Sequence, residues 1–188
     1  MDYLSYKGNG KTKMENIKKI EIELESICPI LMDKYPEEDK KAKTEEEYRK
    51  LAEDKLYKNE KGIFIPSSAI KALIRNASSD LGKKMEGKKN RQTISAGVFF
   101  ESELYINNKK HDGIVKHIVT RGKGDKVTRV PTYRPIFNKW NGKLRANLIG
   151  VNPQFIKECL QLGGLRYGLL GYRPDYGRFV VKNFKEVN

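Results

Sequence analysis

Residues 62–75 read Gly-Ile-Phe-Ile-Pro-Ser-Ser-Ala-Ile-Lys-Ala-Leu-Ile-Arg, which is the clearest local pattern in the chain. A short apolar strand ends at the proline, and the hydroxyls of Ser67 and Ser68 can then cap the first free amides of an amphipathic helix. Free amides and the positive end of the helix dipole favour an anion such as phosphate, and Lys71 and Arg75 lie beside the apolar stripe. The stretch predicts either a phosphate site or an ordinary capped helix with solvated cations.

Composition indicates a globular protein with a polyanionic partner. The 188 residues suffice for one domain, and 38% of them are hydrophobic, which is enough for a core. The formal net charge of +14 favours nucleic acid as that partner. A generally lysine-rich proteome would give a similar surplus.

Cysteine usage and hydropathy predict a cytoplasmic protein without a membrane partner. Cys28 and Cys159 lie far apart and form no ligand cluster, so we expect free thiols in a reducing compartment. No apolar run approaches the ~20 residues of a membrane span, and no signal peptide is visible. No motif indicates a cofactor.

Periodicity and turn residues predict a single domain. We expect a flexible basic arm at residues 1–16 and one domain over 17–188. In chain order the patterns predict a strand near 20–25, a helix capped at Thr44, a helix over 67–84, an exposed turn at 83–91, a strand over 94–106, a hairpin of 113–119 with 126–133, a second hairpin around Asn141 and Gly142, a helix from Asn152 to Gly163, and a strand over 178–184. This order is β-α-β-β-α-β with a hairpin inserted at about 107–138. The predicted class is therefore α+β with a ferredoxin-like, RRM-like core.

Two segments combine cations with groups that contact nucleic acid. Residues 107–150 hold eleven Lys or Arg and two acids, a local net charge of +9, interleaved with aromatic side chains. Cations neutralise phosphates while aromatic and guanidinium planes stack on bases, which suits single-stranded nucleic acid. A glycine-rich segment over 163–178 adds arginines beside a backbone that a ligand can approach closely. The contact residues predicted from the two segments are Arg121, Lys123, Lys126, Arg129, Tyr133, Arg134, Gly164, Arg166, Tyr167, Arg173 and Arg178.

Each segment also has a purely structural explanation. A solvated hairpin with its aromatic side chains in the core would carry the same residues, and for Trp140 we expect the core. The glycine-rich segment would then be a tight connection.

Two motifs resemble the RAMP superfamily, which includes the Cas7-like subunits of CRISPR effector complexes. The pattern from Gly62 to Arg75 resembles the strand–serine–helix motif of that superfamily, and the run from Gly163 to Val181 resembles its C-terminal glycine-rich loop and strand. The resemblance implies a ferredoxin core in which the inserted hairpin serves as a thumb. It also implies side-by-side assembly along a strand and a role in antiviral defence. The chain is short for a Cas7 subunit, which fits a stand-alone relative from a phage or mobile element.

Catalysis has little support in the sequence. His111 and His117 lie on one face of a predicted strand but too far apart to share a metal easily. Some Cas7-like subunits cleave RNA with an aspartate after the first strand, and the resemblance makes Asp33 a weak candidate. We therefore expect a non-catalytic protein that binds single-stranded nucleic acid, RNA rather than DNA, and associates with itself or with CRISPR effector subunits. The alternatives are a RAMP-type endoribonuclease in RNA processing and an inhibitor that mimics a Cas7 subunit.

Overall fold

The computed structural model describes residues 17–35, 42–82, 84–122 and 127–187. The predicted arm at 1–16 and the hairpin tip at 123–126 lie outside the described residues. The described elements are β1 (Lys18–Ser26), β2 (Ile30–Leu31), α1 (Glu45–Glu53), β3 (Lys58–Asn59), β4 (Gly62–Ile65), α2 (Ser67–Asp80), α3 (Lys84–Gly97), β5 (Val98–Phe100), β6 (Leu104–Ile106), β7 (Gly113–Arg121), β8 (Thr128–Phe137), β9 (Asn141–Leu148), α4 (Pro153–Arg166) and β10 (Phe179–Val187).

A large antiparallel sheet forms the centre of the molecule. Its strand order is β10-β1-β9-β6-β4-β3, and β5 also pairs with β9. The predicted alternation of the first strand is confirmed in β1, where Ile20, Ile22 and Leu24 are fully buried while the intervening glutamates face outward. Because β1 lies between β9 and β10, its apolar side chains occupy the middle of the core.

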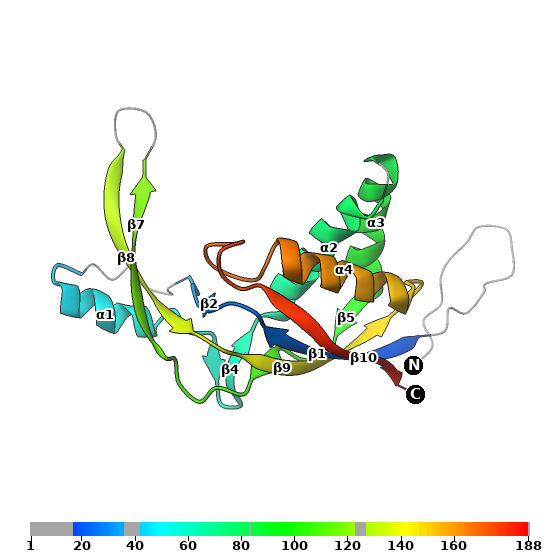
Figure 1. Cartoon of the computed structure of the whole chain (residues 1–188), viewed down its shortest axis with the longest axis horizontal. Coiled ribbons are helices and arrows are strands. Elements are labelled where there is room, and N and C mark those ends of the chain that lie inside the picture. Colours follow the sequence, from blue (N-terminus) through cyan, green and yellow to red (C-terminus); the bar gives the residue numbers. More distant parts are fainter. Residues whose placement is uncertain (1–16, 36–41, 83, 123–126, 188) are drawn as a thin grey trace, which may run out of the picture.

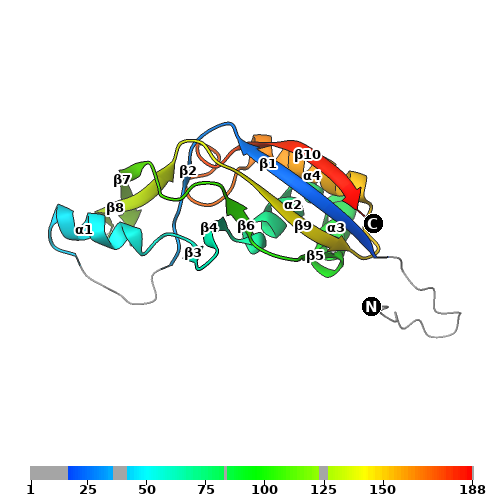
Figure 2. The same cartoon turned by 90° about the horizontal axis from the view of Figure 1, so that it is seen from below.

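Helices α2, α3 and α4 cover one face of this sheet, and the strands lie in front of them when the molecule is seen from below (Figures 1 and 2). The predicted start of the last helix is confirmed, since the Asn152 side chain accepts a hydrogen bond from the Gln154 amide at 2.9 Å. The predicted end at Gly163 is wrong, because α4 continues to Arg166. The two glycines let α4 pack tightly: a Cβ would lie 2.3 Å from Leu73 Cδ2 at Gly163 and 2.5 Å from the Phe179 carbonyl at Gly164.

A smaller sheet, β2-β8-β7, carries the predicted hairpin away from the main body (Figure 1). Helix α1 packs against β8. Its predicted capping box is confirmed, with Thr44 accepting from the Glu47 amide at 3.2 Å and the Glu47 carboxylate accepting from the Thr44 amide. The α+β class is therefore observed, with antiparallel sheets and four helices in the described residues.

Three further local predictions are wrong. Residues 84–91 of the expected turn and the start of the expected strand at 94 belong to helix α3, which runs from Lys84 to Gly97. The expected hairpin around Asn141 and Gly142 is absent, because β9 starts at Asn141 and pairs with β1, β5 and β6 rather than with β8. Gly142 instead allows β9 to lie very close to β6, because a Cβ there would lie 2.4 Å from the Tyr105 carbonyl.

Candidate nucleic-acid interface

The glycine-rich loop, residues 167–178, folds back against the segment around β2. The Gly177 amide donates to the Pro29 carbonyl at 2.7 Å, and the Leu169 amide donates to the Gly177 carbonyl at 2.9 Å. Gly177 has φ +78°, and a Cβ there would lie 2.0 Å from the Leu169 carbonyl, so only glycine fits this turn. The loop is therefore held in one conformation by its own backbone.

This loop meets the hairpin in what we call the loop–hairpin junction, formed by Asp33, His117, Arg134, Tyr172 and Tyr176. The His117 ring stacks on Tyr172 with centroids 4.2 Å apart and lies edge-on to Tyr176. The Arg134 guanidinium lies 4.7 Å from the Tyr172 ring centroid and binds the Asp33 carboxylate at 2.9 Å. Burial, and then the charge of Arg134, lower the pKa of His117. Two segments far apart in sequence are thus brought together.

The opposite face of the hairpin packs on α1. Tyr133 is buried and stacks on Tyr48 with centroids 5.6 Å apart. Lys116 and Arg49 lie 5.5 and 5.7 Å from the Tyr133 ring centroid. A hydrogen bond with Tyr133 raises the pKa of Lys116. Because the Tyr133 ring is enclosed, it offers no free face to a base, contrary to the prediction.

Three predicted contact residues are exposed cations. Arg129 lies on β8, and Arg173 and Arg178 belong to the glycine-rich loop. None of the three forms an ion pair with another described residue. They are therefore available to phosphates. Lys123 and Lys126 lie outside the described residues, and Arg121 is placed only as the last residue of β7.

The start of α2 differs from the prediction. Ser67 and Ser68 do not cap the helix, because Pro66 is the N-cap and no side chain accepts a capping hydrogen bond there. Instead, the Ser67 amide donates to the carboxylate of Glu103. Lys71 lies 5.2 Å from the Phe99 ring centroid, and burial followed by the nearby Arg75 lowers the pKa of Lys71. The predicted phosphate position thus already holds an anion of the chain.

The remaining predicted residues stabilise the fold. Arg166 binds the Asp80 carboxylate at 3.0 Å, and the Tyr167 hydroxyl donates to the same carboxylate. Gly164 is buried inside α4. To contact a ligand, as predicted, Arg166 and Tyr167 would therefore have to give up these bonds to Asp80 of α2.

Cations on the open face of the main sheet are paired with the glutamates of β1. Glu21 binds Arg145 and Lys185, each at 2.9 Å. The other pairs are Glu23 with Lys143 at 3.4 Å and Glu25 with Lys182 at 2.6 Å. Two cations of the +9 segment, Lys143 and Arg145, are therefore neutralised within the chain.

The described residues contain no group of three or more His, Cys, Asp and Glu side chains that could hold a metal ion. No described helix has both the length and the apolar character that crossing a bilayer requires. His111 binds Glu53 at 2.6 Å and lies apart from the loop–hairpin junction.

Comparison with solved structures gives a structural likeness. No family model matches the chain, and no curated protein matches it. Among solved structures, the chain resembles part of a Type III-B Cmr-beta complex bound to cognate target RNA, with a TM-score of 0.57 and 13% sequence identity. The match covers 91% of this chain and 61% of that chain, so this chain spans about three fifths of its length. At this identity the likeness establishes a shared fold.

Proposed function

We propose that the chain binds single-stranded RNA along the glycine-rich loop and the hairpin, without cleaving it. The observation that carries the proposal is the loop–hairpin junction, where Tyr172 stacks on His117 at 4.2 Å. The exposed cations Arg173 and Arg178 belong to the loop that contacts the hairpin at this junction. Such an arrangement suits a flexible polyanion, because several cations can follow its backbone while the fold stays rigid.

We further propose that the core is ferredoxin-like and that the protein is a Cas7-like member of the RAMP superfamily. The strand order β10-β1-β9-β6, with α2 and α4 in the connections, supports this proposal because it fits a β-α-β-β-α-β unit. The similarity to a chain of an RNA-bound Cmr complex supports it as well. On this proposal the hairpin is a thumb, and copies assemble side by side along the RNA or join effector subunits.

RNA cleavage is the rival proposal, and it depends on Asp33. The Asp33 carboxylate is held by Arg134 at 2.9 Å and lies 3.9 Å from the Lys55 ammonium group. Because both contacts tie this carboxylate to cations of the chain itself, it is not free to contact a substrate, and we favour binding without cleavage. An inhibitor that occupies the place of a Cas7 subunit would bind effector proteins and leave free RNA unbound.

The test is a titration of labelled single-stranded RNA at stepped salt concentrations. Contacts from the three exposed arginines should give a slope of log affinity against log salt of about −2 or steeper. A flat slope would reject the proposal. The same RNA should remain intact on a denaturing gel, whereas cleavage that is lost in Asp33→Asn would establish the rival. Light scattering on strands of increasing length should show particles that grow with the strand if copies assemble along it.

A further inference from the structure

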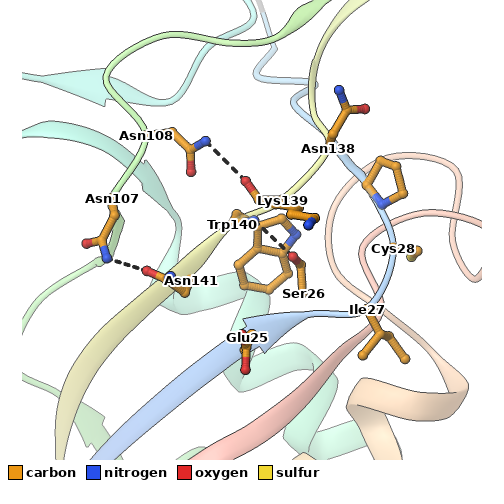
Figure 3. A pocket seen from close by; sticks show the side chains of 11 residues that line it. Glu25, Ser26, Ile27, Cys28, Asn107, Asn108, Asn138, Lys139, Trp140 and Asn141 are labelled. Carbon is orange, nitrogen blue, oxygen red and sulfur yellow. Dashed lines mark hydrogen bonds between the residues drawn. The ribbon is translucent and has the colours of Figure 1, made fainter.

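A pocket of about 560 Å³ lies beside the base of the hairpin (Figure 3). Three connections meet around it: the link from β1 to β2, the connection from β6 to β7, and the turn from β8 to β9. Its lining comes from residues 25–29, 107–108 and 138–141. The volume is in the range of small-ligand sites in proteins and is sufficient for one nucleotide.

The frame of the pocket is already formed in the free chain. The Ser26 amide donates to the Trp140 carbonyl at 2.9 Å, and the Trp140 amide donates to Ser26 Oγ, also at 2.9 Å. On the other side, the Asn107 amide donates to the Asn141 carbonyl at 3.2 Å. Because backbone hydrogen bonds tie all three connections together, a ligand can enter without an ordering cost for the walls.

The polar part of the lining consists mainly of carboxamides. Asn108 Nδ2 donates to the Lys139 carbonyl at 3.1 Å, and Asn107 donates to Asn141 (Figure 3). The Asn138 side chain is exposed and makes no hydrogen bond to another described residue. A carboxamide presents one donor and one acceptor side by side, which complements the edge of a nucleobase.

The other walls suit the flat faces of a base. Ile27 is 48% exposed beside Pro29. Trp140 is buried, and its indole N–H has no partner among the described residues. The lining also holds one acidic side chain, Glu25, and one basic side chain, Lys139. Glu25 is already paired with Lys182 at 2.6 Å.

The pocket borders the glycine-rich loop. The Arg178 amide donates to Cys28 Sγ at 3.2 Å, and the Ile27 amide donates to the Arg178 carbonyl at 3.0 Å. A strand whose phosphates follow the loop therefore passes the mouth of the pocket.

We infer that this pocket receives one unstacked nucleobase of the bound strand. The inference rests on the proposed function and extends it from phosphate contacts to a base contact. The edge of the base pairs with Asn138, and one face of the base lies on Ile27.

The experiment compares oligoadenylate with the same strand made abasic, at one low salt concentration. Since stacking and edge contacts to a base are substantial, the wild-type protein should bind the base-bearing strand at least about fivefold more tightly. The variant Asn138→Ala/Ile27→Ser should lose most of this preference while its affinity for the abasic strand stays unchanged. The matched control, Asn183→Ala/Leu81→Ser, removes an exposed amide and an exposed leucine that do not line the pocket. It should behave as the wild type does.

Each outcome decides a separate point. Salt-dependent binding with no preference for the base-bearing strand overturns the pocket inference and leaves the proposed function standing. A full preference in Asn138→Ala/Ile27→Ser overturns the pocket inference as well, provided that circular dichroism shows a folded variant. Failure of the wild-type protein to bind either strand overturns the proposed function, and the inference falls with it.

Discussion

The open face of the main sheet and the hairpin with its glycine-rich loop both carry many cations, yet the sheet cations beside β1 are paired with its glutamates while several of the hairpin and loop cations are unpaired. On the sheet, Lys143, Arg145 and Lys182 each bind a glutamate of β1. On the hairpin and loop, Arg129 and Arg173 are exposed and bind no described carboxylate. A count of cations along the sequence therefore overstates the surface that can meet a polyanion, because long-range pairing decides which charges remain free.

The first way to sharpen this comparison is to remove one half-buried ion pair, at the junction, and one exposed ion pair, on the sheet. Arg134→Ala should destabilise the protein by about 3 kcal/mol, because it leaves Asp33 without its closest partner and Tyr172 without its stacking guanidinium. Arg145→Ala, at a side chain that is 61% exposed, should cost less than about 1 kcal/mol. Urea denaturation of both variants gives the two values. Equal losses would mean that the junction contributes no more than a surface pair.

The second way is a matched removal of three cations from each region. Arg129→Gln/Arg173→Gln/Arg178→Gln should weaken RNA binding by some tens of fold at physiological salt and make the salt slope shallower by about 2. Lys143→Gln/Arg145→Gln/Lys182→Gln removes the same charge from the sheet, where each cation is already paired. Its effect should be severalfold smaller. If both triple variants lose affinity equally, net charge alone controls binding and the comparison between regions breaks down.

The third and smallest effect concerns the pH dependence of the sheet face. Hydrogen bonds from Lys185 and then Arg145 lower the pKa of Glu21, so the carboxylate stays charged below the usual glutamate range. The stabilisation from these pairs is present above the ordinary glutamate pKa and is lost only as the pH falls through the lowered value. At neutral pH, Glu21→Gln should increase the affinity for oligouridylate by up to about fourfold, because one net positive charge is added.

This difference between Glu21→Gln and the wild-type protein should disappear once the pH is low enough to protonate Glu21 in the wild type. Affinity ratios measured across the acidic range provide the check. A ratio that stays constant with pH would show that the released cations do not face the RNA.

Locally encoded elements were predictable from the sequence. The alternation in β1 and the Asn152–Pro153 start of α4 depend on neighbouring residues only, and both are confirmed. Helix α3 was missed because its sequence is polar, with Ile94 as a fully buried side chain near its end. The Asn141–Gly142 pair has strong hairpin propensity, but pairing with β1 and close contact with Tyr105 override it.

The candidate site was predictable in part for the same reason. Composition pointed to the hairpin and to the glycine-rich loop, which the structure brings together. The pairing of Asp33 with Arg134 and the enclosure of Tyr133 by Tyr48 depend on tertiary contacts that no local pattern encodes. The pocket beside Trp140 was missed because its asparagines come from separate connections, each unremarkable in sequence.

Aromatic contacts hold both faces of the hairpin at the same position along its length. Tyr48 of α1 stacks on Tyr133 on one face, and Tyr172 of the loop stacks on His117 on the other. Beyond that position β7 and β8 continue as a two-stranded arm (Figure 1). The two aromatic contacts therefore form a pivot about which the outer part of the hairpin can tilt. We expect a sideways force on the outer part of the hairpin to compress one of these aromatic contacts and to open the other. A partner that pulls on the hairpin would thereby shift the loop arginines without touching them.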